Sequence, residues 1–398
     1  MLINLDDPTS KRVRGVALLQ LGFRPFFLLA GLSSALLLFY WGFIFQTGSE
    51  RLAYSPISWH GHEMIFGYVV AVVAGFLLTA AKNWTGKQTL NGATLMLLVL
   101  LWLAGRAGAL MAEVLPLWLI SLIDLSFIPI LAVAVAVPIV QARNYRNLVF
   151  IGILLIYAVA NGMFHLGTNT VFNNGEAIGI YTGLYTVILL ISVMGGRVIP
   201  FFIERGLSNG FTAIKRKSID VSSIALLIGF AILHIAGVDG RLTAAVALAA
   251  AIAHGIRLAG WYHHGIWRVP LLWVLVTAYG WIVLGLLLMV PAMLGQLSVM
   301  LAIHAITVGG IGLVTAGMMV RVSMGHSGRK LQAPDSLVLS FILLNIAAVV
   351  RVLVPIVLPG LYSDAVFVSA MIWGIAFMMF VVRMAPVYWL PRTDGRPG

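Results

Sequence analysis

The stretch WHGHEMIFG, residues 59–67, opens a run that is almost entirely apolar as far as residue 81. A run of about 20 apolar residues is the length that an α-helix needs to cross a lipid bilayer. Two histidines and a glutamate in such a helix are costly to bury, so each of them requires an explanation. The stretch therefore predicts a membrane-spanning helix that carries functional polar groups.

The rest of the chain repeats this apolar pattern. Of its 398 residues, 61% are hydrophobic and only 10% are charged, whereas a soluble domain has roughly 25% charged residues. This composition excludes a soluble globular protein, and its high hydrophobicity excludes a disordered chain. The alternation of apolar and polar residues that a membrane β-barrel needs is absent. We therefore expect an all-α, polytopic transmembrane helical bundle.

About twelve apolar segments are long enough to span a membrane, and we expect them to form one integral membrane domain over residues 1–398. Residues 1–18 and 389–398 are the predicted tails. The predicted spans are residues 19–46, 60–81, 91–112, 116–140, 148–168, 177–203, 219–236, 242–261, 270–294, 297–320, 336–358 and 363–388.

The positive charges lie almost entirely on one side of this topology. Most of the 25 lysines and arginines fall in the tails or in the links on the side of the two termini, whereas only Arg51 and Arg241 fall in links on the other side. Positive residues mark the cytoplasmic side of membrane proteins, so both termini should be cytoplasmic. The basic N-terminal segment has no small-residue cleavage site and predicts an uncleaved tail. Because the +12 charge is spread between spans, no nucleic-acid partner is expected.

The chain has no cysteine, which excludes disulfides, iron–sulfur clusters, covalently attached c-type haem and copper–thiolate centres. Any metal must therefore be held by histidine, methionine, carboxylate or backbone oxygen. No nucleotide-binding motif of an ATP-driven pump is present either.

Five of the nine histidines fall near the outer ends of their spans, in one layer of the predicted topology. They are His60, His62, His165, His234 and His304. A layer of imidazoles from several helices is typical of metal or haem ligation inside a bundle. The alternative is that these histidines only form hydrogen bonds with neighbouring helices, without a cofactor.

Helical spacing places His60 and His62 on different faces of the predicted helix. On a regular α-helix, His60 shares a face with Glu63 and Met64, whereas His62 points to nearly the opposite side unless the first turn is irregular. One histidine is then available to a cofactor and the other to a second site or a structural bond. Glu63 is a candidate for orienting an imidazole through its second ring nitrogen. For Met64, packing is favoured over metal ligation.

Two arginines lie in the outer halves of spans and have two interpretations. Arg106 is expected to pair with Asp124, and the alternative is that its guanidinium binds a haem propionate. For Arg351, the sequence does not decide between a structural role and binding of a haem propionate. Asn161, one turn before His165, is expected to bond a neighbouring helix.

Four glycines in the span after His304 would let another helix pack closely, or would let a flat macrocycle lie against the helix. Helix packing is the more common role. The predicted link after that span, residues 321–330, is expected to form a tight turn that anchors the chain at the cytoplasmic surface, near lipid head groups.

Several blocks of the chain together resemble the NnrS family of bacterial membrane proteins. They are residues 22–27, 59–67, 75–80, 83–86, 197–202, 304–310 and 321–329. The resemblance implies a haem- and copper-containing protein of the bacterial inner membrane, associated with nitric oxide and nitrosative stress. The motif positions that transfer are Arg24, His60, His62, Glu63, Met64, His165, His304, Arg321, His326 and Arg329.

We therefore expect a haem and copper membrane protein whose partners are nitric oxide or a related gas and membrane lipids. His304, His165 and His60 are the expected iron ligands. His62, with Met64 or His234, is the expected copper ligand. The alternative function is a proton-coupled secondary transporter that uses the outer histidines and Glu63 as a relay or substrate site.

Overall fold

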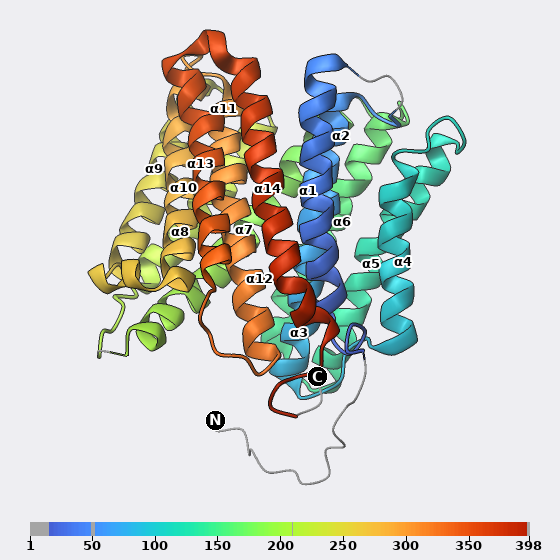
Figure 1. The fold of residues 1–398 in the computed structure, drawn as a ribbon. Coiled ribbons are helices and arrows are strands. Elements are labelled where there is room, and N and C mark those ends of the chain that lie inside the picture. Colours follow the sequence, from blue (N-terminus) through green and yellow to red (C-terminus); the bar gives the residue numbers. More distant parts are fainter. Residues whose placement is uncertain (1–15, 49–51, 209, 396–398) are drawn as a thin grey trace.

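The computed structural model describes residues 16–48, 52–208 and 210–395. Within these ranges all regular secondary structure is helical, and no strand is present (Figure 1). The predicted helical bundle is thus confirmed. Its elements are α1 (Phe23–Thr47), α2 (Pro56–His62), η1 (Glu63–Val69), α3 (Val70–Thr85), α4 (Gly92–Gly108), α5 (Leu117–Gln141), η2 (Tyr145–Leu148), α6 (Val149–Thr168), α7 (Gly175–Leu207), α8 (Lys217–Ile235), α9 (Gly240–Trp261), η3 (His264–Arg268), α10 (Pro270–Met293), α11 (Val299–His304), η4 (Ala305–Gly312), α12 (Leu313–His326), α13 (Asp335–Val357), η5 (Pro359–Leu361) and α14 (Tyr362–Trp389).

Every predicted span corresponds to a helix. Eleven helices of the described chain are long and apolar enough to cross a membrane, and Gly92–Gly108 is a shorter apolar helix. The backbone N–H of Ala17 donates to the carbonyl of Trp389 at 2.9 Å. The two ends of the described chain therefore lie on the same side of the bundle, as an even number of crossings requires. Most of the predicted N-terminal tail, residues 1–15, lies outside the described residues.

The last helix closes the bundle on the first. Helix α14 packs along α1 and α13. Helix α9 packs against both α8 and α10, at the left of the bundle in Figure 1. Small residues allow the close approach, because a Cβ at Gly374 would lie 2.5 Å from the Phe39 ring. Segments from the beginning and the end of the chain thereby come together, which brings distant histidines within reach of each other.

Two spans contain a π-helix. Segment η1 lies between α2 and α3 and begins directly after His62, and η4 lies between α11 and α12 and begins directly after His304. π-Helical segments often mark functional sites, because their wider turn breaks the α-helical register of the side chains. The predicted common face of His60 and Met64 is confirmed, because both line one cavity, whereas Glu63 contacts His62 and Arg106 instead of sharing that face.

The glycines that follow His304 serve helix packing. A Cβ at Gly309 would lie 2.3 Å from Trp281, and a Cβ at Gly312 would lie 2.3 Å from Trp373. The space in front of both glycines is filled by indole rings. The packing interpretation is therefore confirmed at these two positions, and a macrocycle does not lie against them.

Candidate functional site

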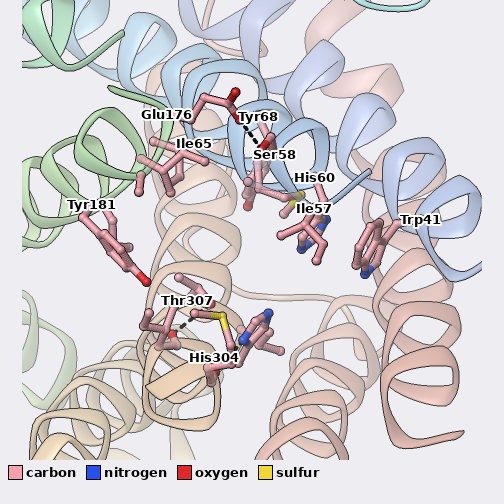
Figure 2. Close-up of a pocket in the computed structure, with 18 of the residues that line it drawn as sticks. Trp41, Ile57, Ser58, His60, Ile65, Tyr68, Glu176, Tyr181, His304 and Thr307 are labelled. Atoms are coloured by element: carbon pink, nitrogen blue, oxygen red, sulfur yellow. Dashed lines mark hydrogen bonds between the residues drawn. The ribbon is translucent and has the colours of Figure 1, made fainter. Parts of the chain in front are cut away.

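A cavity of about 680 Å³ lies between helices from both halves of the chain (Figure 2). Its wall includes His60 of α2, His304 at the end of α11 and Arg351 of α13. Most of the remaining lining is apolar and aromatic, including Trp41 and Trp373. A large apolar cavity with a few convergent polar groups is typical of a small-molecule or cofactor site.

The two cavity histidines face each other with parallel rings. The ring centres of His60 and His304 are 6.4 Å apart, and the ring planes differ by only 2°. His60 also stacks on Trp41, with ring centres 4.2 Å apart, which fixes the plane of its imidazole. The two rings therefore lie close enough to contact the same ligand in the cavity.

The protonation of His304 is determined by its backbone neighbour. Its Nδ1 donates to the carbonyl oxygen of Met300 at 2.6 Å, and a carbonyl can only accept. In the neutral ring, Nε2 therefore carries the lone pair that a metal ligand needs. A hydrogen bond of this kind commonly orients metal-ligating histidines.

Arg351 brings an incompletely paired guanidinium to the same cavity. The side chain is 6% exposed, and its Nη2 donates to the hydroxyl of Tyr362 at 3.2 Å. Its Nη1 is buried and has no hydrogen-bond partner within the described chain. Buried donors normally have an acceptor, and a carboxylate is the group that a guanidinium binds best. The donor set of the cavity thus fits a metal-containing ligand that bears a carboxylate.

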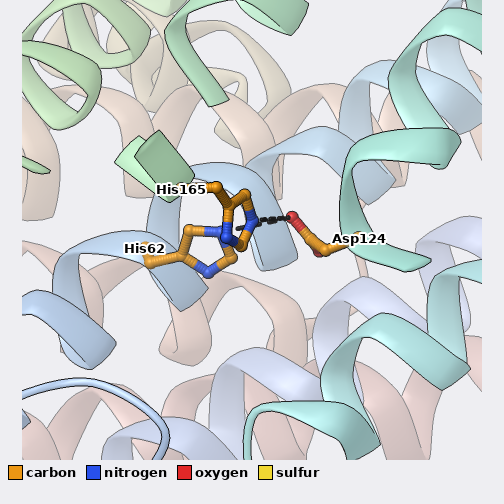
Figure 3. A group of neighbouring side chains, drawn as sticks. All are labelled: His62, Asp124 and His165. Atoms are coloured by element: carbon orange, nitrogen blue, oxygen red, sulfur yellow. Dashed lines mark hydrogen bonds and ion pairs between the residues drawn. The ribbon is translucent and has the colours of Figure 1, made fainter. Parts of the chain in front are cut away.

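A second cluster consists of His62, Asp124 and His165, which point toward one another from α2, α5 and α6 (Figure 3). The Nε2 atoms of His62 and His165 lie 3.3 and 3.1 Å from the same oxygen, Oδ2 of Asp124. All three side chains are buried. One ligand atom from each residue lies within 4.8 Å of the others, so the three could hold one metal ion.

Three further polar side chains surround this His62–Asp124–His165 cluster. His62 Nδ1 donates to Glu63 Oε1 at 3.0 Å, so Glu63 does orient an imidazole, that of His62. Arg106 donates to Glu63 Oε2 at 3.1 Å and also to Asp124. The expected pair of Arg106 with Asp124 is therefore confirmed. Arg106 thus lies with two carboxylates in this cluster, whereas Arg351 lines the cavity of His60 and His304.

Asn161 completes the cluster and shows the expected bond to a neighbouring helix. Its Nδ2 donates to Asp124 Oδ2 at 2.7 Å, and its Oδ1 lies 3.2 Å from His62 Nε2. Two chemical states are compatible with these contacts, and both leave His165 Nδ1 without a partner among the described residues. In one, His62 is protonated and the charges of Glu63, Asp124, Arg106 and His62 cancel. In the other, a metal ion takes the lone pairs of both Nε2 atoms and one Asp124 oxygen, in the two-histidine, one-carboxylate arrangement of many metal sites.

Tyr54 is a neighbour of this cluster that the sequence did not reveal. Its ring centre lies 5.4 Å from that of His62 and 5.9 Å from that of His165. Its hydroxyl is buried without a hydrogen-bond partner within the described residues. Burial, assisted by the nearby carboxylates, raises the pKa of Tyr54 far above its ordinary value, so the phenol keeps its proton. Tyr54 lies in the link before α2, where no sequence pattern distinguishes it.

The structure groups the predicted ligands differently from the sequence prediction. His165 lies with His62 instead of with His60 and His304. Met64 lines the cavity beside His60. His234 Nδ1 lies 2.7 Å from the Tyr185 hydroxyl, between α8 and α7, away from the His62 cluster. The expected sets were wrong in this respect because the order of helices in the bundle decides which layers of histidine meet.

The remaining motif residues stabilise the other end of the bundle. Arg24 Nη1 donates to the carbonyls of residues 387, 388 and 390, at distances of 2.8–3.2 Å. His326 Nε2 lies 3.2 Å from Asn83 Nδ2. Arg321 lies over the Phe202 ring at 3.7 Å, inside α12 and not in a link, because that helix continues to His326. Arg329 lies in the turn that follows.

Comparison with known proteins gives one family. A family model described as NnrS protein matches residues 17–392 of the 398-residue chain. No curated protein matches the sequence significantly.

Proposed function

The chain belongs to the NnrS family, and from this premise we propose that it is a haem- and copper-containing protein of the bacterial inner membrane that binds or processes nitric oxide. The observation that carries the proposal is the parallel pair of His60 and His304 across a cavity that also holds Arg351. Its many apolar helices make the chain a multi-pass membrane protein. Nitric oxide is small and uncharged, so a site inside the membrane is open to it.

The cavity is the proposed haem site. His304 and His60 would hold the iron, and Arg351 would bind a propionate through its unpartnered Nη1. A haem bound there supplies an iron atom that can take a small diatomic gas. The fixed orientation of His304 suits a permanent ligand, because the Met300 carbonyl keeps its Nδ1 protonated and its Nε2 unprotonated. His60 is held only by stacking on Trp41 and is the more readily displaced of the two.

The His62–Asp124–His165 cluster is the proposed copper site. Its donors are two imidazole nitrogens and one carboxylate oxygen, without sulfur, which suits Cu²⁺ better than Cu⁺. Glu63 would receive the other N–H of His62, as carboxylates do behind many metal-bound imidazoles. Arg106 would balance the charge of the two carboxylates.

The test is an absorption spectrum of the protein purified in detergent, with iron and copper quantified on the same sample. The proposal predicts a haem Soret band that shifts when nitric oxide is added. A protein that stays colourless and metal-free after reconstitution with haem and copper would contradict the proposal. Proton-coupled solute flux in liposomes made with that protein would then favour the transporter alternative.

A further inference from the structure

A second cavity of about 90 Å³ lies beside the first, toward the opposite end of the bundle. Its wall comes from four elements: α1, the η1–α3 segment, α7 and α12. The side chains that matter below are Val69, Phe76, Met194, Val314 and Met318. The cavity is far too small for a haem or a lipid chain, whereas an apolar cavity of about 150 Å³ is known to bind benzene or xenon.

Among its described lining residues, the second cavity has no free polar group that could hold a water molecule. Among the described residues that line it, Thr315 alone has a polar side chain. The Thr315 hydroxyl is occupied by the carbonyl of Ile311 at 2.7 Å and by the hydroxyl of Tyr68 at 2.5 Å. A buried water needs two to four polar partners, and an apolar cavity without them stays dry. The space therefore suits an uncharged, apolar guest.

The two cavities share a wall one side chain thick. Val69 lines both of them. Tyr68 lines the first cavity, and its hydrogen-bond partner Thr315 lines the second. Val69 is thus the side chain whose movement would connect the two cavities.

The second cavity reaches the outer surface of the bundle. Several of its lining side chains are only half-buried, namely Phe76 on α3, Ile191, Met194 and Val198 on α7, and Met318 on α12. These residues lie within membrane-spanning helices. In a membrane, such half-buried apolar side chains face the lipid hydrocarbon, where uncharged gases dissolve.

We infer that this second cavity is a lateral passage by which a small uncharged gas travels from the lipid, between α3, α7 and α12, to the cavity of His60 and His304. The inference deepens the proposed function and rests on it, because the gas is taken to be the ligand of that cavity. Its occupant is a diatomic molecule of the size and polarity of nitric oxide or carbon monoxide.

The first test is independent of haem. Crystals of the wild-type protein under xenon pressure should show a xenon atom bounded by Val69 and Val314. The variant Val314→Phe should lose it, because the added ring fills the space. Wild-type crystals without xenon at this position would overturn the inference even if the protein proves to bind haem. Xenon bound in a protein that takes up no haem would leave the passage standing and refute only the proposed haem site.

The second test measures the rate of gas entry. Carbon monoxide rebinding after flash photolysis should slow about tenfold in Val314→Phe, which corresponds to a barrier about 1.4 kcal/mol higher. Val69→Ala should accelerate rebinding, because it thins the shared wall. Met318→Trp, at the half-buried mouth, provides a second blocked variant should Val314→Phe fail to fold. The matched control is Val382→Phe on α14, whose side chain is 69% exposed and is not among the residues that line the passage. Rates within about twofold of wild type in every folded blocked variant would overturn the inference.

Discussion

The two imidazoles of the large cavity differ in what holds them. His304 is tied to the backbone of its own helix through Nδ1, whereas His60 is positioned by the face of Trp41. Asp124 has the corresponding central place in the second cluster, because two histidines, Asn161 and Arg106 all converge on its carboxylate. Because their contacts differ, substitutions of His304, His60 and Asp124 should differ in their effects on haem and copper content.

His304→Ala is expected to abolish most haem binding, because it removes the ligand with the fixed orientation. His60→Ala should retain part of the haem and change its absorption spectrum, since one of the two imidazoles that would hold the iron is removed. The pyridine haemochromogen assay and the absorption spectrum measure both outcomes. Equal haem content and identical spectra in wild type and both variants would refute these ligand assignments.

Asp124→Asn should reduce copper content without changing haem content. The substitution keeps the side-chain volume but removes the negative charge on which both imidazoles converge. It also leaves Arg106 with one carboxylate instead of two, so a loss of stability of about 3–5 kcal/mol is expected in addition. A thermal unfolding curve recorded on the samples used for metal analysis separates the two effects. Asp364→Asn, at the start of α14 and outside the cluster, is the control. Wild-type copper content in a folded Asp124→Asn protein would exclude the cluster as the copper site.

At the scale of elements, the two π-helices and the glycines that follow His304 determine what the cavity can contain. The glycine faces are covered by Trp281 and Trp373, so they fix α12 and η4 against α10 and α14. The sequence alone could raise both interpretations of these glycines but could not choose between them, because the choice depends on which helix lies opposite. The π-helical segment η1 could not be predicted from the sequence either, because an α-helical and a π-helical turn can have the same amino-acid composition.

Gly309→Ala is therefore expected to destabilise the protein by about 1–3 kcal/mol, the usual cost of overpacking a core. The new methyl group would lie 2.3 Å from Trp281, so the indole ring or the helix must shift. Gly152→Ala in α6 is the matched control, because nothing lies within 4 Å of its Cβ position. Alanine should stabilise that helix by about 0.5–1 kcal/mol. Thermal unfolding in detergent measures both changes, and equal unfolding temperatures for the two variants would contradict the packing account.

At the scale of the whole molecule, the sequence was sufficient for the helical bundle and for the place of each apolar helix along the chain, because hydropathy predicts both. It was also sufficient for the pair of Arg106 and Asp124, whose predicted depths match. It was not sufficient for the pairing of His62 with His165 or of His60 with His304. Those pairs depend on which helices pack against each other, and a single sequence does not predict that arrangement.

The predicted orientation in the membrane has a direct test, since the chain has no cysteine of its own. Lys87→Cys and Arg241→Cys place single thiols at exposed positions in links on opposite sides of the predicted topology. A membrane-impermeant thiol reagent added to intact cells should label Arg241→Cys and leave Lys87→Cys unlabelled until the membrane is permeabilised. The reverse pattern would place the termini outside.

Haem and copper are thus assigned to two separate sites, one formed by His60 and His304 and the other by His62, Asp124 and His165. Haem and copper quantified together in purified His304→Ala and His165→Ala proteins test this separation. His304→Ala should lose haem and keep copper, while His165→Ala should lose copper and keep haem. Parallel loss of both cofactors in each folded variant, or no loss in either, would exclude two separate sites at these residues.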